Sequence, residues 1–272
     1  MLAKKINMYS TLTLLKKYLQ YLIKSENGKG HGVHSPFVYT FIKEVLNKNS
    51  KPPLVGVIEA RRKSLEKNKQ KIQVWDRGAG SRQTDHTERT IQQIAKAALK
   101  PKKYSQLLYK IVAYYKPAQI IEMGTSLGIT TCYLAAGNVN ARVVTLEGAP
   151  NVASMAKETF QQIGMQHIEV LEGDFKDTLP HYIDTVDNID LAYVDGNHRY
   201  EPTIQYFNWL LEKSEEETVL IFDDIHWSVE MEKAWAEIKM HPSVTLTIDL
   251  FFIGLVFVRK AQKEKEHFVI RY

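Results

Sequence analysis

The stretch that decides the fold is QIIEMGTSLGITTCYLAAG, residues 119–137. Its first residues are apolar and predict a buried strand, its glycines predict a turn, and its second half predicts a helix. The turn carries Glu122, Gly124 and Gly128 in an E-x-G-x-x-x-G spacing. Glycine lets the backbone adopt positive φ and pass close to a ligand, and the following helix points free N–H groups at the turn. The stretch therefore predicts a site for a nucleoside-like cofactor.

A regular alternation of strand-like and helix-like segments follows this turn. Such an alternation predicts a mostly parallel sheet with helices on both faces. The last two strand-like runs, 244–250 and 253–259, are separated by only two residues, and so short a connection requires an antiparallel pair. We therefore expect an α/β fold: a doubly wound, Rossmann-like, seven-stranded sheet with an antiparallel C-terminal hairpin. The five preceding strands are expected at 119–123, 142–148, 167–173, 189–195 and 218–224.

The N-terminal part differs in composition. Residues 1–117 contain 24 Lys/Arg and 7 Asp/Glu, whereas residues 118–272 contain 12 and 24, although the whole chain has a net charge of only +5. We expect a basic, mainly helical extension over residues 1–102, acting as a lid, substrate or dimer region, and a cofactor-binding domain over residues 103–272. Within the extension, helices are expected at 10–24, 37–46 and 84–99, and residues 47–72 as an exposed polar connection.

A basic half can attract an anionic substrate, nucleic acid or a membrane surface. It can equally dock on the acidic half of its own chain or of a sister subunit, which makes a homodimer one expectation. No apolar run approaches the ~20 residues that span a bilayer, and a single cysteine, Cys132, excludes an internal disulfide framework. The simplest interpretation is a cytoplasmic protein without a membrane span.

Further landmarks stand at the ends of the later strands. Glu147 closes the second strand, 25 residues after Glu122, and Gly173-Asp174-Phe175 follows the third. The fourth strand ends in YVDGNHRY with Asp195, and the fifth ends in FDDIHW with Asp223 and Asp224. In this order the residues resemble the class I S-adenosylmethionine-dependent methyltransferases over about residues 103–260, and most closely the catechol and caffeoyl-CoA type of O-methyltransferase.

The resemblance implies a set of contacts to S-adenosylmethionine. Glu122 and Thr130 would serve the amino acid portion, Glu147 the ribose hydroxyls, and Asp174 the adenine amine. Glu122 and Thr130 also have a structural interpretation, as a surface-facing turn carboxylate and an ordinary helix threonine, and a dehydrogenase would use Glu147 in the same way. The full set implied is Glu122, Gly124, Ser126, Gly128, Thr130, Glu147, Gly148, Asp174, Phe175 and Asp195.

The resemblance also implies a divalent cation, Mg²⁺ or another, on Asp195, Asp223 and Asp224. Three carboxylates at one sheet edge would repel one another without a cation or proton, and hard divalent ions prefer oxygen ligands. The third ligand here is Asp where the family has Asn. Asp195 and His198 are the expected catalytic residues, with His198 at the position of the family's lysine base; His226 is a weaker candidate. The alternative for each is a cap or a loop brace.

Other motifs carry less weight. RGAGSR, residues 77–82, imitates a glycine loop but precedes a polar stretch, so an accessory loop is expected. Arg77 and Arg82 could contact an anionic substrate, but a plain surface turn is the favoured interpretation. The expected function is O-methylation of a small-molecule hydroxyl. The alternatives are a methyltransferase acting on RNA or protein through the basic part, with nucleic acid not favoured because no RNA-binding signature is present, and a binding module without catalysis. A dehydrogenase is disfavoured by the terminal hairpin.

Overall fold

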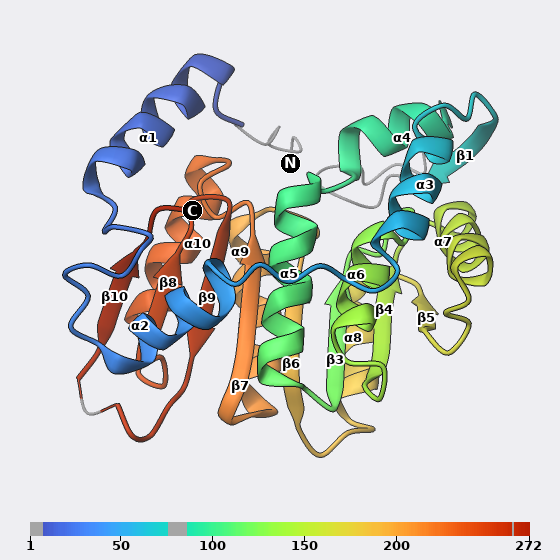
Figure 1. Ribbon diagram of the computed structural model, residues 1–272. Helices are drawn as coiled ribbons and strands as arrows, with labels where there is room; N and C mark the ends of the chain where they lie inside the picture. The colour runs from blue at the N-terminus through green and yellow to red at the C-terminus, as the bar shows by residue number, and fades with distance from the viewer. Residues whose placement is uncertain (1–7, 76–85, 263) are drawn as a thin grey trace, which may run out of the picture. The chain divides into compact units, whose positions relative to one another are not determined.

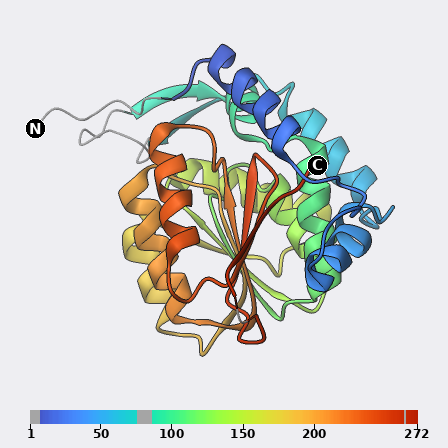
Figure 2. The same ribbon diagram turned by 90° about the vertical axis from the view of Figure 1, so that its left-hand side faces the viewer.

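The computed structural model of the chain describes residues 8–75, 86–262 and 264–272 (Figures 1 and 2). Its packing divides into two compact units. The terminal unit comprises Met1–Lys48 and Ile183–Tyr272, and the central unit comprises Asn49–Tyr182. The loop RGAGSR, with Arg77 and Arg82, lies outside the described residues. The predicted boundary near residue 102 is a different division and stays a prediction.

The sheet portion of the central unit has the strand order β3-β4-β5, with all three strands parallel. Because parallel strands end at the same edge, the register brings Glu122 opposite Thr145 and Glu147 opposite Glu172. Helices cover both faces: α5, α6 and α7 lie on one side and α8 on the other (Figures 1 and 2). These elements are β3 (Gln119–Met123), β4 (Arg142–Glu147), β5 (Glu169–Glu172), α5 (Lys102–Tyr115), α6 (Ile129–Gly137), α7 (Pro150–Ile163) and α8 (Phe175–Ile183).

The expectation of an exposed connection over residues 47–72 is wrong, because α3 (Val55–Leu65) is a helix with a buried side. Ile58 and Leu65 are fully buried. Arg62 is buried as well and donates from Nη1 to the backbone oxygen of Lys100 at 2.9 Å and from Nε to Glu59 at 3.0 Å. These contacts satisfy the hydrogen-bonding groups of a buried guanidinium. From the lysine-rich composition alone, Arg62 was expected to be exposed to solvent.

The predicted helix 84–99 begins later than expected. Residues His86–Thr90 form strand β2, which pairs antiparallel with β1 (Lys71–Trp75), and α4 (Ile91–Ala98) starts directly after it. Thr90 and Gln93 form a capping box, in which each side chain bonds the backbone N–H of the other. The cap fixes the start of α4 at this point in the chain.

The sheet portion of the terminal unit has the strand order β10-β8-β9-β7-β6. β9 runs antiparallel to both of its neighbours, β8 and β7, while β6 is parallel to β7 and β10 is parallel to β8. The expected C-terminal hairpin is therefore confirmed. β10, which the sequence did not predict, adds a strand beyond the seven expected. The strands are β6 (Ile189–Val194), β7 (Ser214–Asp223), β8 (Leu246–Asp249), β9 (Ile253–Phe257) and β10 (Glu266–Val269).

Helices also cover both faces of this portion (Figures 1 and 2). On one face, Phe37 of α2 packs edge-on against Phe257 of β9, with ring centroids 5.0 Å apart. On the other, the Trp235 ring of α10 lies over Gly254, where a Cβ would come within 2.6 Å of it. The helices are α1 (Thr11–Lys24), α2 (Pro36–Phe41), the π-helical turn η1 (Ile42–Leu46), α9 (Tyr200–Glu212) and α10 (Val229–Met240).

The fold class predicted from the sequence is confirmed: an α/β protein with a mostly parallel sheet and an antiparallel C-terminal pair. Strands buried on both faces, such as β9 with all five residues buried, explain the near-continuous apolar runs. Among the helices that the structure describes, none combines the length and apolarity needed to cross a bilayer.

Candidate cofactor and catalytic residues

The loop after β3 has an unusual backbone. Three residues take positive φ, namely Gly124 (101°), Ser126 (48°) and Gly128 (79°), and Gly128 is the N-cap of α6. A Cβ at Gly128 would lie 2.6 Å from the Phe160 ring, so packing and conformation both require glycine there. No side chain caps α6, and the first N–H groups of a helix lack intrahelical partners. The loop thus presents backbone donors at the carboxyl end of β3.

Glu147 ties this loop to the end of β4. Its Oε2 accepts a hydrogen bond from the Ser126 N–H and its Oε1 accepts one from the Ala149 N–H, both at 2.9 Å. Burial raises the pKa of Glu147, and the backbone N–H groups of Ala149, Ser126 and Gly148 counteract that rise. A carboxylate offers about four lone-pair sites, so Glu147 retains acceptor capacity for further hydroxyl donors.

Glu122 is fully buried among hydroxyl groups rather than exposed in the turn. Its Oε2 accepts hydrogen bonds from Thr131 and, at 2.7 Å, from Thr145. Thr145 also contacts Thr125 at 2.7 Å. The carboxylate therefore braces β3, β4 and the first turn of α6 from behind the loop. Thr130, the neighbour of Thr131, is buried in the same helical turn.

Asp174 caps α8 at the end of β5. Its Oδ1 accepts a hydrogen bond from the Lys176 N–H at 3.1 Å, and its backbone oxygen receives the N–H of Thr178. The Lys176 ammonium lies 3.8 Å from Oδ2. Phe175, the first residue of α8, is half-buried. Asp174 thus caps the first turn of α8, and its carboxylate keeps lone pairs that the cap does not use.

In the terminal unit, Asp195 and His198 lie in the turn that follows β6. His198 Nε2 lies 3.5 Å from Asp195 Oδ1, and the Tyr193 hydroxyl donates to Asp195 Oδ2 at 3.0 Å. Asn197 and His198 both have positive φ, 67° and 37°. Strained backbone of this kind persists where surrounding contacts hold it and is typical of functional loops. Asp195 thus orients a half-buried imidazole.

The three aspartates predicted to hold a metal occupy different surroundings. Asp223 is the last residue of β7 and is fully buried, whereas Asp224 is half-buried in the turn after it. Asp224 has positive φ (54°), and its N–H donates to the Phe252 oxygen at 2.7 Å. Over residues 8–75, 86–262 and 264–272, no three acidic, His or Cys side chains come together as a metal-binding group. The predicted three-ligand site is therefore not assembled among the described side chains, and the cation stays a prediction.

His226, the weaker candidate for a base, belongs to a charged cluster. Its Nε2 lies 2.8 Å from Asp249 Oδ2 and its Nδ1 lies 3.1 Å from Glu232 Oε1, and its ring stacks on Phe251. Burial lowers the pKa of His226, but the two carboxylates outweigh that effect and raise it to about 9. Both ring nitrogens of His226 are thus engaged by carboxylates of α10 and β8, which gives the ring a structural role. Its candidacy as a base stays a prediction.

Comparison with known proteins shows a family similarity over part of the chain. Residues 121–225 match the family model of the methyltransferase domain. This chain is therefore similar to methyltransferase domains over that segment. Within it lie Glu122, the glycine loop, Glu147 and Asp174 of the central unit, and Asp195, His198, Asp223 and Asp224 of the terminal unit.

Similar proteins include the O-methyltransferase imqG of Aspergillus flavus, which is 32% identical over 111 residues. That stretch is 39% of this chain and 44% of the relative, so the match spans less than half of that protein's length. A Bacillus cereus O-methyltransferase solved with SAH has the same fold, with 20% identity and a TM-score of 0.55, over 81% of this chain and 97% of the other. The SAH-bound Podospora anserina methyltransferase PaMTH1 is similar too, with 14% identity and a TM-score of 0.57 over 93% and 97%.

The central-unit residues within the segment 121–225 fit an adenosine cofactor. The Ser126 Oγ is buried and has no hydrogen-bond partner among the described residues. A buried hydroxyl in that state is costly unless a ligand satisfies it. Together with the uncapped helix α6 and the remaining lone pairs of Glu147, this hydroxyl gives the loop a donor and acceptor set suited to a ribose and its substituents.

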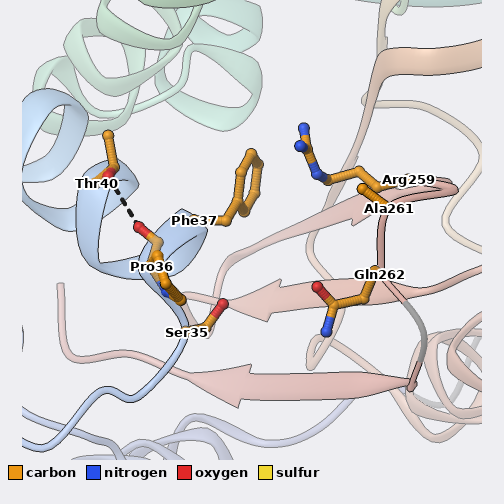
Figure 3. Close-up of a pocket in the computed structure, with 7 residues that line it drawn as sticks. All are labelled: Ser35, Pro36, Phe37, Thr40, Arg259, Ala261 and Gln262. Carbon is orange, nitrogen blue, oxygen red and sulfur yellow. Dashed lines mark hydrogen bonds between the residues drawn. The ribbon is translucent and has the colours of Figure 1, made fainter.

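One open hollow in the terminal unit lies apart from the predicted site residues. It has a volume of about 430 Å³ and none of the predicted cofactor, catalytic or metal residues lines it (Figure 3). The guanidinium of Arg259 lies 4.3 Å from the centre of the Phe37 ring there. The lining residues are Ser35, Pro36, Phe37, Thr40, Arg259, Ala261 and Gln262.

Three features around the candidate site residues were not predicted from the sequence. Thr131 and Thr145 hold Glu122, and the signal for Thr145 was its place at the same level of the next parallel strand. The positive φ of Ser126 carries no signal in residue type, since serine rarely adopts it. The partners of His226 lie 6 and 23 residues further along the chain, so spacing alone does not reveal them.

Proposed function

We propose that this protein transfers a methyl group from S-adenosylmethionine to a hydroxyl oxygen of a small molecule. The observation that carries the proposal is the loop of Gly124, Ser126 and Gly128, pinned by Glu147 at the ends of two parallel strands. Ligands of open α/β sheets bind outside the carboxyl ends of the strands. The similarity of residues 121–225 to methyltransferase domains supports the same assignment.

Each cofactor-binding residue has a distinct part in this proposal. Glu147 accepts from the ribose hydroxyls, Asp174 accepts from the adenine amine, and Phe175 flanks the base. The loop N–H groups and Ser126 bind the remaining polar groups, while Glu122 keeps the loop in shape. Bound S-adenosylmethionine supplies an electrophilic methyl group on a sulfonium centre. The chain itself supplies alignment and exclusion of water, which are the main protein contributions to a displacement of this kind.

His198 is the proposed general base. With its Nε2–H directed at Asp195, the imidazole carries its lone pair on Nδ1 and can accept the proton of the substrate hydroxyl there. We expect His198→Gln to lower kcat by about 10²-fold or more while changing KM little. The limb of the pH–rate profile that reports the base should disappear as well. A variant with an unchanged profile would remove His198 from this role.

The cofactor assignment is tested by isothermal titration with S-adenosylhomocysteine, the demethylated product. Saturable binding supports the proposal, and an absence of heat and of any competition with S-adenosylmethionine contradicts it. Transfer of a labelled methyl group to a panel of small hydroxyl compounds then tests the acceptor. 3,4-Dihydroxybenzoate belongs in that panel because it is anionic, and the basic half of the chain favours an anionic substrate.

A divalent cation on Asp195, Asp223 and Asp224 stays a separate prediction. No step above depends on it. Activity that is lost in EDTA and restored by Mg²⁺ would support the cation, together with loss of activity in Asp224→Ala. Activity that is unchanged by EDTA and by that substitution would contradict it and leave the methyltransferase proposal intact.

The charge of residues 1–117 supports a second candidate, a methyltransferase that acts on RNA or protein. A filter-binding assay with RNA at physiological salt separates the two, because the small-molecule proposal expects only weak, salt-sensitive binding. A homodimer and a cytoplasmic location belong to the same proposals, the former tested by light scattering and the latter by fractionation.

A further inference from the structure

Helix α1 exposes a row of large apolar side chains. Leu12, Leu15, Leu19 and Ile23 have exposed fractions of 79, 53, 52 and 83%. Their spacing of three, four and four residues places them on one side of the helix. We call these four residues the α1 stripe. Large exposed apolar rows on a folded protein mark an interaction surface rather than chance.

The opposite side of α1 is already occupied by the terminal unit. Tyr21 is buried and its hydroxyl donates to the Ile270 oxygen at 2.5 Å. The Tyr18 ring lies 5.0 Å from the Phe251 ring, and Lys17 Nζ lies 2.9 Å from both carboxylate oxygens of Glu232. These contacts fix the rotation of the helix. The α1 stripe therefore lies on the side of the helix opposite these contacts and is exposed.

The charges beside the stripe have one sign. α1 contains no Asp or Glu, and its exposed charges are Lys16 and Lys24. Lys16 lies at the edge of the stripe, four residues after Leu12 and three before Leu19. A lysine can lay its methylene stem along apolar surface while its ammonium reaches outward. An apolar row bordered only by cations is complementary to a surface that is apolar inside and anionic outside.

A second copy of the chain offers no comparable surface among the described residues. The other large exposed apolar side chains form no comparable row: Val229 and Met240 stand at opposite ends of α10, and Leu54 and Val57 at the start of α3. The rest are Tyr39, Tyr114 and Val139, apart from Met8, which precedes α1. Pairing of one α1 stripe with another would bury apolar area but bring lysines together without an acidic partner. That arrangement lacks the charge complementarity of specific interfaces.

We propose that the α1 stripe docks this protein on anionic phospholipid membranes. A 14-residue helix is about 21 Å long, which is too short to span a bilayer but suits a helix lying in the interfacial plane. The apolar side chains enter the boundary between headgroups and acyl chains, and Lys16 and Lys24 contact lipid phosphates. The proposal is independent of the chemistry at the strand ends.

Vesicle flotation of the full chain tests the proposal. We expect at least about tenfold stronger binding to vesicles of 30% phosphatidylglycerol in phosphatidylcholine than to pure phosphatidylcholine, weakened by 0.5 M salt. The double substitution L15E/L19E should abolish most of the binding, and K16E/K24E should abolish the preference for anionic lipid. V139E/M240E, which adds the same charge at two exposed apolar positions elsewhere, is the matched control and should bind normally.

Circular dichroism and thermal unfolding establish that the variants are folded; Glu is a good helix former, so α1 should persist in L15E/L19E. Equal binding to neutral and anionic vesicles, or equal loss in L15E/L19E and V139E/M240E, would overturn the proposal. So would light scattering that shows a dimer of the wild type and a monomer of L15E/L19E, with no vesicle binding by either. That last result would assign the stripe to a second copy of the chain.

Discussion

Gly128 illustrates how much one residue of the cofactor loop is constrained. Its φ of 79° disfavours any side chain, and a Cβ would also lie 2.6 Å from Phe160 and 3.3 Å from the Ala156 Cα. Gly164 has a similar φ of 84° but nothing within 4 Å of the position of a Cβ. The two glycines therefore separate the cost of backbone conformation from the cost of crowding.

Gly128→Ala should lower the free energy of unfolding by about 2–4 kcal/mol, the sum of a left-handed backbone term and an overpacking term. Gly164→Ala should lower it by about 1 kcal/mol, from the backbone term alone. Urea denaturation of both variants measures the difference. Equal losses would mean that Phe160 moves aside without cost.

Glu147 offers a second test at this scale. Glu147→Gln keeps the shape of the side chain but removes the charge from hydrogen bonds that are charge-assisted, each worth about 1.5–3 kcal/mol. We therefore expect the Kd for S-adenosylhomocysteine to rise by about 10–100-fold. Glu172→Gln, at the end of the adjacent strand β5, is the control, because Glu172 is exposed and pairs with Lys157 at 2.6 Å. Titration calorimetry that gives equal Kd values for both variants would contradict the role of Glu147.

The positions of the candidate site residues were predictable where these residues follow the strand ends, whereas their contacts to a cofactor stay predictions. Glu147 and Asp174 sit where alternation and acidic strand endings put them. The surroundings of Glu122 were not predictable, because its burial depends on hydroxyls from β4 and α6 that only the fold brings together. The engagement of His226 by Asp249 and Glu232 is likewise a tertiary effect.

Among the elements, α1, α10 and β8 are linked by one charged cluster. Glu232 of α10 accepts hydrogen bonds from Lys17 of α1 and, at 2.6 Å, from Tyr9, while His226 joins Glu232 to Asp249 of β8. Burial raises the pKa of Glu232, but His226, Tyr9 and Lys17 together lower it to about 2. The cluster thus holds the N-terminal helix through ionised groups.

The pH dependence of this cluster has a defined direction. Because the folded pKa of His226, about 9, lies above its ordinary value of 6.5, its stabilisation is fully present below pH 6.5 and is lost as the pH rises through 9. The loss should be on the order of 1–3 kcal/mol. Thermal unfolding between pH 6 and 10 measures it, and His226→Gln should flatten the profile in that window. Equal slopes for variant and wild type would contradict the assignment.

Elements with strong periodicity were predicted and those that depend on pairing were not. α1 matches the expected helix 10–24 because its apolar spacing is helical. β10 was not predicted because a short, half-buried edge strand has little apolar pattern. β2 was not predicted because its residues are mostly polar and form a strand only by pairing with β1. α3 was not predicted because its arginines suggested an exposed segment. In the structure these arginines are buried and hydrogen-bonded to residues distant in sequence.

At the scale of the whole molecule, cofactor binding should appear as global stability. A ligand present at 100 times its Kd stabilises the folded state by about 2.7 kcal/mol. For a chain of 272 residues this corresponds to a rise in Tm of roughly 5–10 °C. Differential scanning fluorimetry with S-adenosylhomocysteine measures the shift, and Glu147→Gln at the same ligand concentration should shift less. No shift in the wild type at saturating ligand would contradict the cofactor assignment.

The contacts that α1 and the residues after it make around β10 join segments that are synthesised at different times. Tyr21 bonds the Ile270 oxygen, and the Glu26 N–H donates to the Val269 oxygen at 2.7 Å. During synthesis, residues 8–26 leave the ribosome well before residues 269 and 270 and wait for these partners while the intervening residues are made. The central unit, by contrast, is one continuous segment and has all its strands once residue 182 is out. The α1 stripe and the inner side of α1 are therefore both exposed to solvent during synthesis. In that period α1 is a binding site for chaperones that recognise exposed apolar helices.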